Sequence, residues 1–578
     1  MHRKWLVSRT NTEFISYIAK AASVSPVLAQ ILINRGIKTA DDIKDFLHPG
    51  IAKLSDPFEL GNMSGAVERI KESISRNQRI LIHGDYDADG LSSTAIVFQA
   101  LKALGADCHY FIPNRFAHGY GFNPEGVKKA KAIGAGLIIT VDCGITSFEA
   151  VNLSNKEGID VIITDHHEPV VRLRDKKDDA SCIMHHASFE LPDAVAVVNP
   201  KVSNRDSGLS NLSGAGIALK LVQALVTIHD SRFTIHDFLD LAALGTIADV
   251  VPVTGENRVI VSRGLRLIRE SRRPGIRALI KISGMEGREI KAGSLSFSLI
   301  PRLNAAGRID DASDVVDMLT TDSVDKAAET ASRLDRLNSE RQRIEEDIFL
   351  EAVARLKHKN TSSAIVIASE SWHQGVIGIV ASRISEQFCR PAVVLSIEGS
   401  VAKGSARSIP SFDICKAFSD CSELLIGFGG HRQAAGIKLD AANLDTFEKK
   451  LCSIFDSAAG IESTPSITID ADVNLAEINH GLVKELGMLE PLGYGNPEPL
   501  LASKMLEVVS PRIVGNNHVK MKLRHKSYYI DAIGFDMGGN FEDLNHSAQI
   551  DAVFTPSVNE WNGGRYLQLI LKAFRPSL

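Results

Sequence analysis

Residues 79–90 read RILIHGDYDADG and place four potential metal ligands directly after a short apolar run. The run at residues 80–82 predicts a buried strand, and Gly90 permits a sharp turn after the loop. The four ligands are His83, Asp85, Asp87 and Asp89. Carboxylates this close together repel one another and raise one another's pKa unless a cation neutralises them. The stretch therefore predicts a divalent metal site at the end of a strand.

Two other interpretations of this stretch are open. The pattern Asp-x-Asp-x-Asp-Gly also begins an EF-hand calcium loop, whose twelfth position needs a bidentate carboxylate. That position is Ile96 here, which cannot bind a cation. Aspartates also cap helices, and a helix is expected to begin near Leu91. A cap accounts for one aspartate but not for three together with a histidine, so the metal site is favoured.

The chain around this stretch alternates between strand-like apolar runs and helical patterns from residue 79 to about residue 200. The expected strands are 79–83, 108–112, 137–141, 161–164 and 194–198, and the expected helices between them include 92–104 and 124–133. This alternation predicts a parallel sheet with helices on its faces. Ligands of such folds bind at the carboxyl ends of the strands.

Candidate ligands follow two further strands of this predicted sheet. They are Asp142 after one strand, and Asp165, His166 and His167 after the other. One aspartate after a strand is usually a turn residue, but three strands that release acids or imidazoles at the same edge predict one composite site. Asp249 follows the helix expected over 237–247 and is a further candidate, although a simple turn residue is an equally good interpretation there.

The composition is that of a globular protein with several domains. At roughly 150 residues per domain, 578 residues predict about three to five domains. No apolar signal-peptide core follows Met1 and no window approaches the ~20 apolar residues of a membrane span, so we expect a cytoplasmic protein. Seven cysteines without a CxxC pair favour reduced thiols over a disulfide framework or a zinc ribbon. The net charge of −5 means that nucleic-acid binding would depend on local basic patches.

Two such patches occur. Residues 258–291 hold ten Lys or Arg against three Glu, a local charge of +7 that could follow a phosphate backbone, although charge runs are usually solvated helix faces. In the strand expected over 518–525, Lys520, Lys522 and Arg524 alternate with apolar residues and would form a basic face. The short strands around it predict a small barrel of the OB type that binds single-stranded nucleic acid.

The patterns divide the chain into five expected parts. They are an N-terminal helical segment at 1–60, the parallel-sheet domain at 61–322, a connecting helix at 323–357, a second α/β domain at 358–460 and the barrel at 461–578. The connecting pattern contains no Gly or Pro and would span about 50 Å at ~1.5 Å per residue. The second α/β domain carries glycine-rich loops at 403–408 and 427–432, which suit either phosphate binding or tight turns.

Several motifs together resemble the DHH phosphoesterase superfamily and, within it, the RecJ family of bacterial single-strand-specific 5′→3′ exonucleases. HGDYDADG at 83–90 and DHH at 165–167 carry the superfamily resemblance. The narrower resemblance rests on LNAAGR at 303–308, WHQGVIG at 372–378, GGHRQAAG at 429–436 and LEPLGYGNPEP at 489–499. These motifs cover nearly the whole chain in the expected order.

The resemblance implies a DHH domain joined by the long helix to a DHH-associated domain, with a nuclease cleft between them and an OB-fold clamp. It also implies two Mn²⁺ or Mg²⁺ ions, one held by His83, Asp87 and Asp142 and the other by Asp89, Asp142, His166 and Asp249. His167 would face the scissile phosphate and Asp165 would orient its histidine neighbour, whereas the role of Asp85 is open. Arg308 would be a further catalytic residue that holds the substrate phosphate. The residues implied to bind substrate are Arg115, Asn304, Ser405, Arg407 and His431, and the basic strand of the barrel adds Lys520, Lys522 and Arg524.

The implied activity is two-metal hydrolysis of single-stranded DNA to 5′-mononucleotides in DNA repair and recombination. Mixed Asp and His ligands suit Mn²⁺ or Mg²⁺. The expected partners are single-stranded DNA, single-strand-binding protein and a RecQ-type helicase, for a monomer that does not bind a membrane. Two alternatives stay open. A small-nucleotide phosphodiesterase of the superfamily would share the ligands but would not need basic patches, and a non-catalytic DNA-binding scaffold would lack several ligands.

Overall fold

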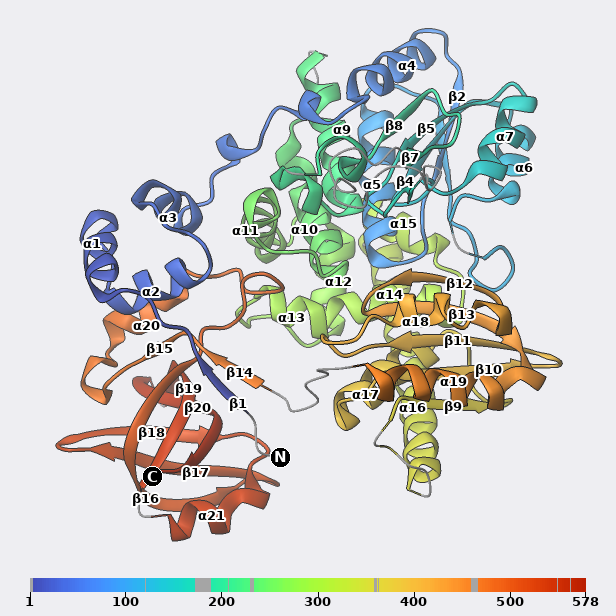
Figure 1. The fold of residues 1–578 in the computed structure, drawn as a ribbon. Helices are drawn as coiled ribbons and strands as arrows, with labels where there is room; N and C mark the ends of the chain where they lie inside the picture. The colour runs from blue at the N-terminus through green and yellow to red at the C-terminus, as the bar shows by residue number, and fades with distance from the viewer. Residues whose placement is uncertain are drawn as a thin grey trace, which may run out of the picture. The chain divides into compact units, whose positions relative to one another are not determined.

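The computed structural model describes residues 4–119, 121–171, 189–205, 207–228, 233–357, 361, 363–458, 466–547, 549–561 and 563–577 (Figure 1). The chain divides into two compact units. The small unit contains Met1–Lys4, Pro301–Asp311 and Glu329–Ile467, and the large unit contains Trp5–Ile300, Ala312–Ala328 and Thr468–Leu578. Each unit is described separately below.

A five-stranded parallel sheet with the order β3-β2-β4-β5-β8 forms the centre of one part of the large unit. Its strands are β2 (Arg79–His83), β3 (Cys108–Phe111), β4 (Ala135–Val141), β5 (Asp160–Thr164) and β8 (Ala196–Val198). The inner strands β2, β4 and β5 are almost completely buried, because helices cover both faces. The parallel sheet predicted from the alternating pattern is confirmed.

One layer of helices covers each face of this sheet. α6 (Pro124–Ala132) and α7 (Phe148–Lys156) pack on the face that carries Leu81, Ile138 and Val161. On the other face lie α5 (Ala88–Ala103) and α9 (Gly214–Ile228), and α10 (Leu239–Ala248) packs against both of these helices (Figure 1). α5 begins at Ala88, earlier than the predicted Leu91, because Asp87 caps it by accepting hydrogen bonds from the backbone N–H groups of Asp89 and Gly90.

The small unit is built on a mixed five-stranded sheet with the order β12-β13-β11-β10-β9. The strands are β9 (Ile365–Ser369), β10 (Ala392–Glu398), β11 (Val401–Arg407), β12 (Leu425–His431) and β13 (Ala434–Asp440). Its helices are α17 (Ile377–Phe388), α18 (Ile414–Ser419) and α19 (Leu444–Ser457). The predicted connecting helix is α16 (Val324–Leu356), which is 33 residues long and runs from one unit into the other.

The C-terminal part of the large unit is a closed barrel in which β16 pairs with both β17 and β19. Its strands are β15 (Ala471–Asp472), β16 (Leu501–Val514), β17 (His518–His525), β18 (Tyr528–Gly534), β19 (Gln549–Trp561) and β20 (Gly564–Pro576). β19 and β20 pair antiparallel as a hairpin, although Asn562 of its turn lies outside the described residues. The predicted barrel is therefore confirmed.

The N-terminal helices share one hydrophobic core with this barrel, which the sequence did not indicate. The helices are α1 (Thr12–Ala22), α2 (Pro26–Asn34) and α3 (Ala40–Leu47). Fully buried Ile31 and Leu32 of α2 belong to the same cluster as Leu501 and Phe554 of the barrel. Residues from the two ends of the chain therefore depend on each other for burial of their apolar side chains.

Within the described residues, no single helix is long and apolar enough to cross a membrane. α1 and α2, which are bent by 108° relative to each other, are the one pair of helices that is long and apolar enough when the two are taken together.

Four of the ten basic residues in the segment 258–291, all of them arginines, bind other groups of the protein, whereas most of the ten are exposed. That the segment follows a phosphate backbone therefore stays a prediction. The segment includes α11 (Gly255–Glu270), α12 (Pro274–Ile282) and the residue before α13 (Ala292–Phe297). Arg263 donates to Pro49 O, Arg269 donates to Ile290 O, and Arg273 pairs with Asp240 at 3.0 Å. A local charge count cannot distinguish side chains that face solvent from side chains that face the protein interior.

The fourth of these arginines, Arg258, joins three parts of the large unit. Arg258 is only 2% exposed, and its guanidinium donates to Phe46 O and to four consecutive carbonyls of residues 488–491, at 2.7 to 3.2 Å. It also lies 3.8 Å from the ring centroid of Phe46. Burial lowers the pKa of Arg258 to about 10, so it stays charged at neutral pH. Carbonyl groups at the start of the motif 489–499 therefore accept hydrogen bonds from an arginine of α11, and these bonds connect the segment before the barrel to the helices.

We predict that Arg258→Met lowers the free energy of unfolding by about 3 kcal/mol or more, because it leaves several buried carbonyls without donors. Arg258→Lys should recover only part of that loss, since an ammonium offers three donors instead of five. Urea denaturation monitored by circular dichroism measures the change. The control is Arg272→Met, whose side chain is 82% exposed. A loss below about 1 kcal/mol for Arg258→Met would contradict a joining role for Arg258.

Candidate metal centre

The carboxyl ends of three neighbouring strands bring the candidate ligands to one edge of the parallel sheet. β2 ends at His83 and leads into the aspartates of residues 85–89, β4 leads into Asp142, and β5 leads into residues 165–167. Asp249 directly follows α10, which packs against α5. Parallel pairing places these strand ends side by side, so residues far apart in the sequence converge.

Three groups of candidate ligands form a single centre. Within each group, one ligand atom from every residue lies within 4.8 Å of the others. The groups are Asp142 with His166 and His167, Asp89 with His166 and Asp249, and Asp85 with Asp87 and Asp142. Because Asp142 and His166 each belong to two groups, the three are continuous. Of the predicted ligands, Asp87, Asp89, Asp142, His166 and Asp249 are brought together.

The predicted ligand His83 belongs to none of these groups, whereas Asp85, whose role was open, and His167 do. His83 is fully buried, with its ring centroid 5.1 Å from that of Phe122, and its Nδ1 lies 3.8 Å from Cys143 Sγ. Burial lowers the pKa of His83 to about 3, which keeps the imidazole neutral. A neutral imidazole is the form that binds metals.

The imidazole of His166 lies between two of the carboxylates. Its Nε2 is 3.1 Å from Asp142 Oδ1, and its Nδ1 is 3.5 Å from Asp249 Oδ2. Asp142 has a φ of +61°, which is a strained conformation for a non-glycine residue and costs on the order of 1–3 kcal/mol. Strain of this kind persists where the surrounding structure holds a side chain in a required direction. Asp142 is thus held at the centre of the site.

Asp89 is held by the first turn of α9. Its Oδ2 accepts a hydrogen bond from Gly214 N at 2.7 Å, and its Oδ1 accepts one from Ala215 N at 2.9 Å. The amino terminus of a helix carries partial positive charge, so it favours an ionised carboxylate. No motif in the sequence indicated these two donors. The glycine at the start of a strongly apolar helical pattern was the only local signal.

The carboxylates of the centre are costly to ionise without a cation. Burial, reinforced by the neighbouring aspartates, raises the pKa of Asp89 to about 7 and the pKa of Asp85 and Asp249 to about 8. The same causes raise the pKa of Asp142 well above its usual value. In addition, the buried atoms His83 Nε2 and Asp85 Oδ1 have no hydrogen-bond partner among the described residues. Oxygen-rich donors with imidazole nitrogen fit Mn²⁺ or Mg²⁺, so the residues present suit the implied ions.

His167 and Asp165 form a tight pair beside this centre. His167 Nδ1 lies 2.7 Å from Asp165 Oδ1, and the same carboxylate accepts hydrogen bonds from the backbone N–H groups of His167 and Ile145. Burial alone would lower the pKa of His167, but the Asp165 carboxylate outweighs burial and raises it to about 9. Burial alone would raise the pKa of Asp165, but His167 lowers it to about 2. His167 is therefore an oriented imidazolium at neutral pH.

Arg115 is the one predicted substrate residue that the large unit contributes near these ligands. Its guanidinium carbon lies 5.5 Å from the ring centroid of Tyr86, within the sequence 83–90. Its charge also favours the ionised form of Asp85. Arg115 is thus a cation next to the carboxylate cluster.

Further predicted substrate residues lie within the small unit. Arg308, on α14 (Leu299–Ile309), donates to Gly375 O at 3.3 Å. On β11, Arg407 donates to Ser405 Oγ at 3.0 Å, and a Cβ built on Gly378 would lie 3.1 Å from that same oxygen. The motif at 372–378 therefore lies beside both arginines. His431 is exposed at the end of β12, and Asn304 lies on α14.

The barrel places Lys520 and Lys522 on the outer side of β17, because Val519, Met521 and Leu523 face the core. Arg524 of the same strand is already paired, with its Nε 2.6 Å from Glu507 Oε2 and its Nη1 3.2 Å from Tyr529 Oη. Of the three basic residues predicted to bind nucleic acid on this strand, Lys520 and Lys522 are therefore the better candidates.

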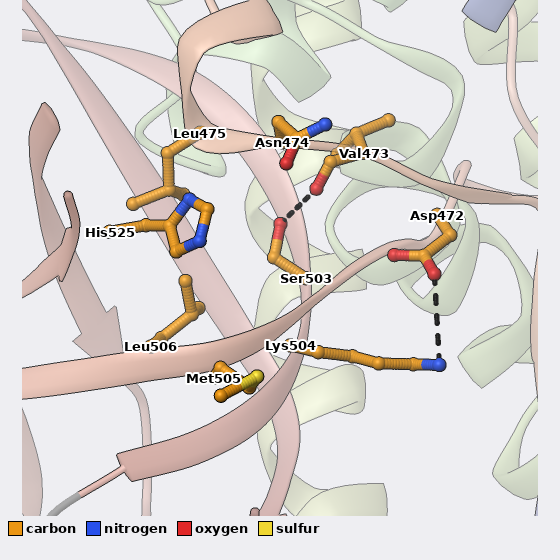
Figure 2. Close-up of a pocket in the computed structure, with 9 residues that line it drawn as sticks. All are labelled: Asp472, Val473, Asn474, Leu475, Ser503, Lys504, Met505, Leu506 and His525. Carbon is orange, nitrogen blue, oxygen red and sulfur yellow. Dashed lines mark hydrogen bonds and ion pairs between the residues drawn. The ribbon is translucent and has the colours of Figure 1, made fainter.

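A hollow of about 270 Å³ opens at the end of β17. Figure 2 shows His525 beside Leu475 and Leu506, across the hollow from the ion pair between Lys504 and Asp472 at 3.9 Å. Two further residues that line the hollow are joined by a hydrogen bond, which Ser503 Oγ donates to Val473 O. The basic strand thus ends at a partly apolar hollow.

Comparisons with known proteins cover nearly the whole chain. Residues 79–246 match the family model described as DHH family, N-terminal domain, residues 360–457 match the DHHA1 domain and residues 469–573 match the RecJ OB domain. These ranges lie inside the parts expected at 61–322, 358–460 and 461–578, whose exact boundaries stay predictions. The single-stranded-DNA-specific exonuclease RecJ of Bacillus subtilis is 38% identical over 576 residues, which cover 98% of this chain and 70% of the relative.

Two solved structures of RecJ from Thermus thermophilus are similar to this chain. The complex with Mn²⁺ has a TM-score of 0.84 and 30% identity, over 99% of this chain and 79% of that one. The complex with Mg²⁺ has a TM-score of 0.77 and 29% identity, over 99% and 78% of the two chains. Mn²⁺ and Mg²⁺, the ions in these two structures, are also the ions that suit the aspartate and histidine side chains described above.

We predict that Mn²⁺ raises the melting temperature more at pH 8.0 than at pH 6.5. Folded aspartates with pKa values of about 7 to 8 retain protons that the unfolded chain has lost, so the metal-free protein should lose stability as pH rises through this window. The raised pKa of His167 acts in the same direction. Metal binding requires those protons to leave, so the affinity should rise by up to about tenfold per pH unit for each proton released.

Differential scanning calorimetry with EDTA or Mn²⁺ at the two pH values measures this effect. Calorimetric titration in buffers of different ionisation enthalpy counts the released protons. A melting-temperature shift that is equal at both pH values, with no proton release, would show that the aspartates are ionised before the metal binds.

Proposed function

The chain belongs to the RecJ family, and from this premise we propose that it is a metal-dependent exonuclease that degrades single-stranded DNA from the 5′ end to 5′-mononucleotides, in DNA repair and recombination. The observation that carries the proposal is the continuous centre of aspartates and histidines at the carboxyl edge of the sheet. A non-catalytic scaffold would not need so many carboxylates, most of them buried or half-buried, in one place. The proposed cofactors are Mn²⁺ or Mg²⁺, with two ions at the centre.

The proposed ligands follow the geometry of the groups. Asp89, His166 and Asp249 would hold one ion, and Asp87 with Asp142 would hold the other, with Asp142 shared. Asp85 belongs to the second group by distance, and His83 stays a candidate through its buried, neutral Nε2. When bound, such a pair of ions supplies an activated water and stabilises the charge that develops on the attacked phosphodiester.

Charged and polar residues of each unit would position the substrate and balance its charge. His167, fixed through Nδ1 by Asp165, would donate from its other ring nitrogen to an oxygen of the scissile phosphate. Arg115 would add a positive charge at the large unit. Arg308, Ser405 and Arg407 of the small unit would bind phosphate oxygens, since a guanidinium matches them in a bidentate manner.

The barrel supports a polymeric substrate over a small nucleotide. The basic segment 258–291 supports that choice less than its charge count suggests, because four of its arginines bind groups of the protein itself. Lys520 and Lys522 on β17, with Tyr529 exposed on the neighbouring β18, combine charge with an aromatic ring, as single-strand-binding surfaces do. Single-strand-binding protein and a RecQ-type helicase as partners, a monomeric state and a cytoplasmic location are further parts of this proposal.

We predict that Asp142→Asn abolishes hydrolysis while single-stranded DNA still binds. The substitution removes the charge shared by two ligand groups, and even outer partners of a metal ligand are worth about 10 to 100-fold in activity. Release of nucleotides from a 5′-labelled single strand with Mn²⁺ measures hydrolysis, and fluorescence anisotropy in EDTA measures binding. Asp107→Asn is the matched control, since this exposed aspartate precedes β3 at the opposite edge of the sheet and pairs with Arg79. Activity of Asp142→Asn within about tenfold of wild type would remove Asp142 from the proposed mechanism.

We also predict that Lys520→Ala with Lys522→Ala weakens binding to long single strands and lowers the salt dependence of binding. Each lost phosphate contact should reduce the slope of log affinity against log salt by about 0.7. Hydrolysis of very short strands should change little. Point substitutions are preferable to deletion of the barrel, because its core includes the N-terminal helices. The control pair is Lys20→Ala with Lys484→Ala on α1 and α20 (His480–Gly487), and an equal loss with this pair would contradict a specific basic face.

A further inference from the structure

Three helical glycines touch the candidate ligands, and we propose that their missing Cβ atoms position those ligands for metal binding. The glycines are Gly126 of α6, Gly214 of α9 and Gly245 of α10. This inference rests on the proposed function, because it concerns the same centre. We call the three together the glycine cradle.

Each glycine lies against a different ligand side chain. A Cβ built on Gly214 would lie 2.4 Å from Asp142 Oδ1 and 2.6 Å from Asp142 Cγ. A Cβ on Gly245 would lie 2.4 Å from Asp89 Oδ1 and also 2.5 Å from Ala215 Cβ of α9. Real Cβ atoms essentially never come within 3.0 Å of such neighbours, so an alanine at either position would displace the carboxylate.

Gly126 has the same relation to His83. A Cβ at this position would lie 2.4 Å from His83 Cδ2 and 2.8 Å from Nε2. Nε2 is the buried nitrogen that has no hydrogen-bond partner among the described residues. The imidazole is confined on other sides by the rings of Phe111 and Phe122, whose centroids lie 5.5 and 5.1 Å away. An added methyl group would therefore turn the imidazole away from its present direction.

Neither backbone conformation nor helix stability explains these glycines. None of the three has a positive φ, so their backbone is open to any residue. Glycine inside a helix is less stable than alanine, because it loses more backbone entropy on folding. The absent side chain is thus the property that these positions use.

The cradle also explains why the ligand atoms can converge. Gly214 leaves room for Asp142 on one side while its backbone N–H donates to Asp89 Oδ2 at 2.7 Å. Gly245 approaches Asp89 from α10, the helix that Asp249 follows. Backbone atoms of two helices therefore occupy the space behind the carboxylates, so these side chains are held toward the centre.

The test measures Mn²⁺ binding to the metal-free full-length protein by isothermal titration calorimetry, independently of hydrolysis. We expect Gly214→Ala, Gly245→Ala and Gly126→Ala each to weaken Mn²⁺ binding by about tenfold or more, as loss of an outer support of a metal ligand does. Circular dichroism and the melting temperature in EDTA establish that each variant is folded.

Two other helical glycines provide matched controls. Gly264→Ala on α11 would clash with Leu239 O and Ala243 Cβ of α10, so it should lower the melting temperature but leave Mn²⁺ affinity unchanged. Gly65→Ala on α4 (Met63–Ser75) meets nothing within 4 Å and should change neither quantity. Together they separate helix packing from ligand positioning.

The proposal is overturned if the folded cradle variants bind Mn²⁺ as tightly as wild type, or if Gly264→Ala weakens binding equally. If Gly245→Ala does not fold, Gly214→Ala and Gly126→Ala decide the question. Failure of the wild-type protein itself to bind Mn²⁺ would instead remove the metal centre, and with it the proposed function and the cradle. Tight wild-type binding combined with unchanged cradle variants would overturn the cradle alone.

Discussion

The burial of several carboxylates at one edge of a sheet is the constraint on which the structure depends. Asp85, Asp89 and Asp142 are each only 2% exposed, and burial, reinforced by neighbouring aspartates, raises the pKa of all three. Such a cluster is unfavourable in a low-dielectric interior unless positive charge compensates it. The chain itself supplies part of that charge through the first turn of α9 and the imidazolium of His167, and a pair of divalent ions would supply the rest.

The remainder of the large unit holds this edge in place. Parallel pairing of β2, β4 and β5 sets the strand ends side by side, and α5, α9 and α10 close the space behind them. Arg258 then connects α11 to the N-terminal helices and to the loop before the barrel through five hydrogen bonds to carbonyls. The same large unit therefore carries both the metal centre and the surface proposed to bind single strands.

The parts of the fold and site that local patterns encode could be predicted from the sequence. The five parallel strands follow from apolar runs, and Asp142 and His166 follow from the rule that ligands gather at strand ends. Asp249 follows a helix instead, so only the family resemblance favoured it as a ligand over a turn residue. The contacts of Arg258 could not be predicted, because charge content does not reveal which way a side chain points. The core that α2 shares with the barrel joins segments from opposite ends of the chain, and no local pattern in either segment indicates that pairing.

The most direct measurement of the central claim is anomalous diffraction at the manganese edge from crystals grown with Mn²⁺. The account predicts two peaks about 3.5–4 Å apart, both in contact with Asp142, with His166 and Asp249 beside one of them. A single peak away from Asp142, or no peak at the carboxyl edge of the sheet, would contradict it.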